Sequence, residues 1–126
     1  MKYIIAIFAA ITLSGCATIS DIVPSFWDNN QSKVAIDIKY NIGIIDCASD
    51  NINTKQILRD VNWFVSYSES KQTKDVIKII NPLKETLVAF DKKVETNKMT
   101  NTYCELKKKI LITQSNRFAE SVLGRY

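Results

Sequence analysis

Three cysteines are the most reactive side chains of this 126-residue sequence, which contains no histidine. A catalytic cysteine usually depends on a histidine base to form its thiolate, so the sequence does not favour a cysteine nucleophile. The lack of histidine also excludes a Ser-His-Asp site and histidine ligands for a metal. The glycines are Gly15, Gly43 and Gly124, and they are too dispersed to form a phosphate-binding loop.

Carboxylates are the remaining candidates for catalysis, because a pair of them can hydrolyse a glycosidic bond. The carboxylates that could meet in space are Asp28, Asp37, Asp46, Asp60 and Glu69. Scattered, solvated surface carboxylates are the simpler interpretation. We therefore expect a protein that is not an enzyme and that has no metal site and no small-molecule substrate.

The first sixteen residues have the composition of an export signal. Lys2 supplies a short positive region, and residues 4–13 form an apolar run. Ten residues of helix rise only about 15 Å, whereas the apolar core of a bilayer is roughly 30 Å thick, so the run is too short to span a membrane. The alternative is a buried N-terminal helix of the domain, but residues 4–11 offer no polar face.

The stretch Leu13-Ser14-Gly15-Cys16 resembles the lipobox of bacterial lipoproteins. The resemblance implies that residues 1–15 are a cleaved signal peptide, and that Cys16 carries a diacylglycerol and an acyl chain such as palmitate. Two or three acyl tails, at about 0.8 kcal/mol per buried methylene, would anchor the chain to a membrane without a transmembrane helix. Ala17 follows the cysteine, where lipoproteins of the inner membrane often carry aspartate. The resemblance thus implies an outer-membrane protein that faces the periplasm.

Lipidation of Cys16 would leave Cys47 and Cys104 as the only possible pair of thiols. Export would place them in an oxidising compartment, so we expect a disulfide between them. The bridge would close a loop of about 58 residues and stabilise the fold by roughly 4 kcal/mol. The alternative is two buried free thiols.

The charge of the chain is mildly positive, at +4 for the full sequence. Its one basic run, Lys107-Lys108-Lys109, lies in a helical pattern and is spread around most of the helix circumference. A solvated helix face explains this run better than a patch for anionic lipid or nucleic acid. We expect no nucleic-acid partner.

Residues 16–30 have no regular pattern, and we interpret them as a lipidated tether. Phe26 and Trp27 are the notable pair within it. They would either rest at the membrane interface or cap the end of the following domain. We favour the cap, because Asp28-Asn29-Asn30 comes next and is a typical start of a helix.

Residues 32–47 are ambiguous, because their apolar side chains alternate as in a strand and also fit a helical period. A helix is favoured, since a lone strand would have no partner. Three later amphipathic segments predict helices over residues 55–71, over about 73–94 and over 102–123. Asn53 or Thr54 and the hydroxyl of Thr73 are the expected caps. Pro82 should kink or break the third of the four helices, and we favour a kinked continuous helix.

The expected fold is therefore an all-α bundle of about four helices with one disulfide, which occupies residues 31–126 after the signal peptide and tether. We expect a lipid-anchored, periplasm-facing envelope protein that acts as a non-enzymatic interaction module and has a protein partner in the envelope. Two stretches also resemble small lipoproteins of tailed phages: Phe26-Trp27-Asp28 and the run from Tyr103 through Lys109. That resemblance implies superinfection exclusion or lysis as an alternative function, and a structural link to the cell wall is another.

Overall fold

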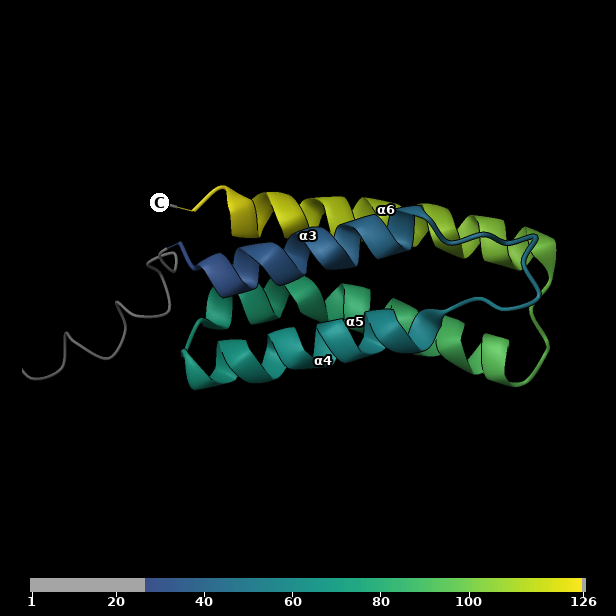
Figure 1. The fold of residues 1–126 in the computed structure, drawn as a ribbon, viewed down its shortest axis with the longest axis horizontal. Helices are drawn as coiled ribbons and strands as arrows, with labels where there is room; N and C mark the ends of the chain where they lie inside the picture. The colour runs from purple at the N-terminus through teal and green to yellow at the C-terminus, as the bar shows by residue number, and fades with distance from the viewer. Residues whose placement is uncertain (1–26, 126) are drawn as a thin grey trace, which may run out of the picture.

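Four α-helices form all the regular secondary structure of the computed structural model, which describes residues 27–125. In the labels of Figure 1 they are α3 (Asn29–Gly43), α4 (Thr54–Ser70), α5 (Lys74–Glu95) and α6 (Asn101–Leu123). Successive helices run in opposite directions, and α3 and α4 form one layer in front of α6 and α5 (Figure 1). This confirms the predicted all-α bundle. The expected signal peptide, residues 1–15, lies outside the described residues.

The helices pack as a closed ring in which each one contacts two neighbours. α3 packs on α4 and α6, and α5 packs on the same two helices. Because the four helices alternate in direction, the beginning of the described chain and its end lie at the same end of the bundle (Figure 1). The turn between α4 and α5 lies at that end too.

Apolar side chains that recur every three or four residues fill the centre of the ring. Phe64 of α4 reaches across to Phe118 of α6, with ring centroids 4.7 Å apart and planes at 85°. Burial of each large apolar side chain contributes about 1.5–3 kcal/mol, so this core is the main source of stability. The largest fully buried apolar residues are Ile38, Ile42, Ile57, Phe64, Ile80, Leu83, Leu87, Phe90, Leu111 and Phe118.

Residues 32–47 contain a helix, as predicted, but that helix is shifted towards the N-terminus. α3 begins at Asn29 and ends at Gly43, so Cys47 lies in the loop beyond it instead of at the helix end. The strand-like alternation has a simple origin. Ile38 and Ile42 face the core, whereas Ile36, Tyr40 and Ile44 form a second apolar stripe that is exposed to solvent.

Side chains cap three of the four helices, and the expected role of Thr73 is wrong. Asp28 accepts from the backbone N–H groups of Asn30 and Gln31 at 2.9 and 3.0 Å. Asn53 caps α4, and Thr100 caps α6. Thr73 precedes α5 but makes no capping bond, because its hydroxyl instead donates to the carbonyl of Ser68 at 3.2 Å.

Pro82 lies inside α5, which runs through it as one 22-residue helix. The proline has no N–H to donate to the carbonyl one turn before it, which weakens the helix locally. Pro82 is exposed, so it contributes no apolar burial in exchange. α5 ends at Glu95, and Asn97 adopts a left-handed conformation with φ 52°, which turns the chain towards α6. Residues 96–100 connect the two helices.

Replacement of Pro82 by alanine should stabilise the protein, because it restores a helical hydrogen bond at an exposed site. We expect a gain of about 1–3 kcal/mol, less the smaller entropic effect of proline on the unfolded chain. Urea denaturation followed by circular dichroism measures it. Asn81→Ala, on the same exposed turn, is the matched control and should change stability by less than about 0.5 kcal/mol. An unchanged midpoint for Pro82→Ala would show that the helix absorbs the proline at no cost.

Candidate functional site

The disulfide predicted between Cys47 and Cys104 is present. Their Cα atoms are 5.8 Å apart, and the bond joins the α3–α4 loop to the first turn of α6 across 57 positions of sequence. Cys104 is fully buried, and Cys47 packs against the same core. The third cysteine, Cys16, lies outside the described residues, so its lipidation stays a prediction.

Loss of this disulfide should strongly destabilise the bundle. The chain-entropy estimate gives about 4 kcal/mol, which for a domain of this size lowers the Tm by roughly 15 °C or more. Cys47→Ala and Cys104→Ala should lower it by similar amounts, because each breaks the same bond, and the double variant should add little. Differential scanning calorimetry with and without reductant measures the effect. A native protein with two titratable thiols and an unchanged Tm would contradict the structure.

The predicted aromatic pair is only partly described. Phe26 lies outside the described residues. Trp27 directly precedes the N-cap of α3, and 46% of its surface is exposed. Its Nε1 donates to Oδ1 of Asn29 at 2.6 Å, which holds the ring beside the start of the helix.

A buried polar network, which sequence analysis missed, closes the same end of the bundle. Gln31 is fully buried and donates from Nε2 to Ser68 Oγ and Thr73 Oγ1, at 2.9 Å each. Its Oε1 accepts from Nη2 of Arg125 at 2.7 Å. One residue thus joins α3, the α4–α5 turn and the end of α6. The network holds the helices together.

Arg125 is the most buried cation of the described residues. Its Nε donates to the carbonyl of Val122 at 3.1 Å, and its Nη1 is buried without a hydrogen-bond partner. Burial lowers the pKa of the guanidinium, while the carboxylates of Asp75 and Asp28 act in the opposite direction. Because arginine stays charged at any ordinary pH, Arg125 does not exchange a proton with a ligand. Its role here is structural.

A second polar cluster joins α4 to α5 on the other side of the ring. Lys55 forms ion pairs with Asp91, at 2.8 Å, and with Glu95. Thr54 donates to the other carboxylate oxygen of Asp91. Burial alone would raise the pKa of Asp91, but the bonds from Lys55 and Thr54 outweigh it and lower that pKa. The bond to Asp91 is the largest cause of the raised pKa of Lys55. These groups hold two helices together.

Three of the five carboxylates considered for catalysis have separate local partners. Asp28 caps α3 and accepts a further hydrogen bond from the hydroxyl of Tyr67 at 3.1 Å. Asp46 accepts from the backbone of Ala48, and Asp60 accepts from the side chain of Gln56. Within residues 27–125, no cluster of three acidic or cysteine side chains could hold a metal ion.

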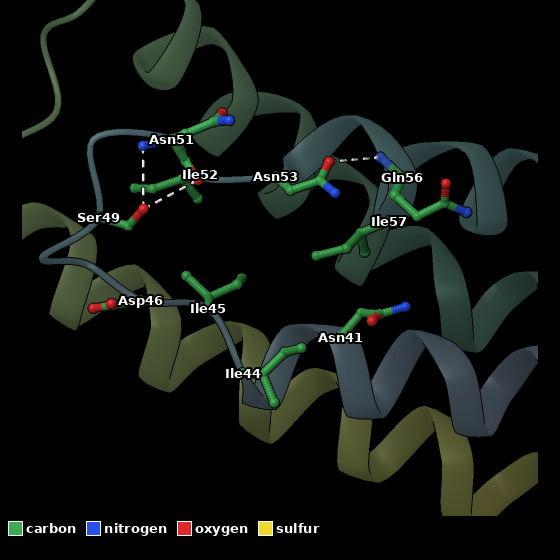
Figure 2. A pocket seen from close by; sticks show the side chains of 10 residues that line it. All are labelled: Asn41, Ile44, Ile45, Asp46, Ser49, Asn51, Ile52, Asn53, Gln56 and Ile57. Atoms are coloured by element: carbon green, nitrogen blue, oxygen red, sulfur yellow. Dashed lines mark hydrogen bonds between the residues drawn. The ribbon is translucent and has the colours of Figure 1, made fainter.

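A shallow pocket lies where α3, the following loop and the start of α4 meet (Figure 2). Its volume is about 210 Å³, which is smaller than the roughly 300–1,000 Å³ of most ligand pockets. Ile45 and Ile57 provide a buried apolar floor. The side chains of Ser49 and Asn53 accept hydrogen bonds from the backbone N–H groups of Asn51 and Gln56, at 3.2 and 3.4 Å. Asp46 is the only ionisable residue in its lining. The full lining comprises Asn41, Ile44, Ile45, Asp46, Ser49, Asn51, Ile52, Asn53, Gln56 and Ile57.

A second surface feature is a set of exposed apolar side chains on α3 and α4 and next to them, which we call the α3–α4 face. It consists of Trp27, Ile36, Tyr40, Ile44 and Trp63, which are between 43% and 65% exposed. Trp63 stacks on Tyr67 with ring centroids 4.7 Å apart, and Tyr67 bonds to Asp28 and Asn30 next to Trp27. Large apolar side chains that stay exposed on two neighbouring helices are candidates for a contact site.

None of the four described helices is both long enough and apolar enough to cross a bilayer. Comparisons with protein-family models, curated proteins and solved structures give no match for this chain. The function therefore has to be argued from the residues themselves.

Asp28 should make the stability of the bundle depend on pH. Burial alone would raise its pKa, but hydrogen bonds from Gln31, Tyr67 and Asn30 outweigh it and lower the pKa. A lowered pKa means that the ionised cap stabilises the fold above about pH 4, and that this stability is lost as the pH falls through the folded value. At pH 7 the charged cap should stabilise by about 0.5–1 kcal/mol more than asparagine does.

Asp28→Asn tests this, because asparagine keeps a capping oxygen but does not titrate. The wild-type protein should be more stable than the variant at pH 7, and the difference should shrink below pH 4. Urea denaturation at several pH values measures it. Asp37→Asn, on the exposed side of α3, controls for the loss of one negative charge. A wild-type advantage that stays constant down to pH 2 would rule out the titration of Asp28 as its source.

Proposed function

We propose that this chain is an exported, lipid-anchored protein of the bacterial envelope that acts by binding and not by catalysis. The observation that carries the proposal is the Cys47–Cys104 disulfide. Disulfides form and persist in oxidising compartments outside the cytosol. With those two thiols joined, Cys16 is the one cysteine left over, and it ends the lipobox-like stretch Leu13-Ser14-Gly15-Cys16.

The arrangement of the polar groups supports a binding role. The side chains with shifted pKa values, Asp28, Lys55, Asp91 and Arg125, serve as a helix cap, as an ion pair between helices and as part of the buried network. These are the roles of groups that hold a scaffold together. The exposed α3–α4 face gives that scaffold a surface for contact. Ala17, next to the proposed lipid site, favours the outer membrane facing the periplasm over the inner membrane.

Replacement of Cys16 by serine tests the anchor. The wild-type chain should incorporate labelled palmitate in a bacterial host and float with membranes, whereas Cys16→Ser should lose the label and the flotation. Thr18→Ser is the matched control, because it changes a residue close to the lipid site, leaves the disulfide intact and should keep both the label and the flotation. A Cys16→Ser chain that still carries palmitate would contradict the proposal.

The identity of the contact then separates the possible roles. Crosslinking of intact envelopes, followed by mass spectrometry, should recover the component that lies against the bundle. An outer-membrane receptor would indicate a blocking role such as superinfection exclusion. An inner-membrane protein would indicate a link between the two membranes, and peptidoglycan fragments would indicate a structural link to the wall.

A further inference from the structure

We infer that the α3–α4 face docks on the phospholipid surface of the membrane that holds the acyl anchor, so that the bundle lies on the bilayer along α3. This inference rests on the proposed lipid anchor and adds an orientation and a second contact to it. The face consists of Trp27, Ile36, Tyr40, Ile44 and Trp63.

The first argument is that α3 is apolar on two opposite sides. Ile38 and Ile42 are fully buried in the core, while Ile36, Tyr40 and Ile44 recur every four residues along the outer side and expose 51%, 65% and 58% of their surfaces. A surface helix normally has one apolar stripe, which faces the core, so a second apolar stripe on the opposite side calls for a second contact. In this bundle α4 and α6 cover the inner sides of α3, and the outer stripe is left open.

The second argument is the kind of side chain on this face. The chain has two tryptophans, Trp27 and Trp63, and both are on it. Tryptophan and tyrosine prefer the boundary between lipid tails and headgroups, where the ring is buried and its polar group stays hydrated. Lys71 lies at the edge of the face, with its Nζ 5.7 Å from the ring centroid of Tyr67, and can reach a lipid phosphate. The exposed residues Lys33 and Lys39 flank the outer stripe of α3, and Asp37 is the acidic residue between them.

The third argument is the length of chain between the anchor and the face. Residues 16–26 separate the acylated position from Trp27 and can span at most about 40 Å. α6, the longest helix with 23 residues, measures only about 35 Å. Every part of the face is therefore within reach of the bilayer that holds the anchor.

This short connection also favours a membrane over a free protein as the occupant. A stable interface between two proteins buries about 800 Å² on each partner, whereas five half-exposed side chains offer only a few hundred Å². A surface joined to the bilayer by a short linker experiences an effective concentration in the mM range, so even a weak lipid contact is populated. A second copy of the chain or a free partner has no such advantage.

The two tryptophans provide the test. Trp27→Phe leaves Trp63 as the sole tryptophan. The lipidated full chain of this variant is reconstituted into vesicles of phosphatidylethanolamine and phosphatidylglycerol, with and without bromine on the acyl chains. Bromine quenches only fluorophores within the lipid, so Trp63 should lose most of its emission in the brominated vesicles, and its emission in plain vesicles should be blue-shifted.

A matched pair of surface variants locates the contact. In the Trp27→Phe background, Ile36→Ser, Tyr40→Ser and Ile44→Ser together should abolish the quenching while the protein still floats. All three residues are exposed, so circular dichroism should show an intact bundle. Val88→Ser with Leu106→Ser, which alters exposed apolar residues of α5 and α6 in the opposite layer, should leave the quenching intact.

Each other outcome overturns a different statement. A chain that floats with its Trp63 emission unquenched has an anchor but no docked face, which overturns the docking alone. Emission that is blue-shifted but unquenched places a second copy of the chain on the face and also overturns the docking. A chain that does not float overturns both the anchor and the docking that depends on it.

Discussion

The contact between α3 and α6 is the constraint on which the rest of the molecule depends, because it closes four helices into a ring. The contact is held at both ends. At one end Arg125 donates to Gln31 across 94 positions of sequence, and at the other Cys47 is bonded to Cys104 across 57. Without it, Phe118 could not reach Phe64 across the core, and the inner side of α3 would be open to water.

The two ends of the bundle hold α3 to α6 with different chemistry. At the disulfide end a covalent bond positions a loop that has few buried groups, and the shallow pocket beside it keeps an exposed, amide-rich rim. At the other end a fully buried glutamine needs a partner for each polar atom, and Ser68, Thr73 and Arg125 supply them. Buried networks of this kind are specific because one missing partner leaves a costly unpaired group.

Most of the fold could be predicted from the sequence, because helix formation depends on local spacing. The apolar period indicated all four helices, and the asparagine and aspartate caps marked the starts of α3 and α4. The one ambiguous segment was α3, because two apolar stripes on one helix produce the alternation of a strand. Thr73 was misassigned because its hydroxyl makes other hydrogen bonds. It donates to the carbonyl of Ser68 and accepts from the side chain of Gln31, which is 42 positions away in sequence.

The features of the surface and the buried network could not be predicted in the same way. Gln31 and Arg125 have no periodic relation, so only the packing of α3 on α6 brings them together. Likewise, the sequence shows that Ile36, Tyr40 and Ile44 are apolar, but it does not show which stripe of α3 faces the core. The pairing of Cys47 with Cys104 was an exception, because once Cys16 was assigned to lipid only one pair remained.

The position of Arg125 also affects the order in which the fold can form. A polypeptide is made from its N-terminus, so α3 exists long before the helix that must cover it. Until α6 emerges, Gln31 lacks its guanidinium partner, Cys47 lacks its thiol partner, and both apolar sides of α3 remain available to other molecules. The ring can therefore close only once α6 is present, and until then the chain exposes apolar surface that the finished bundle buries.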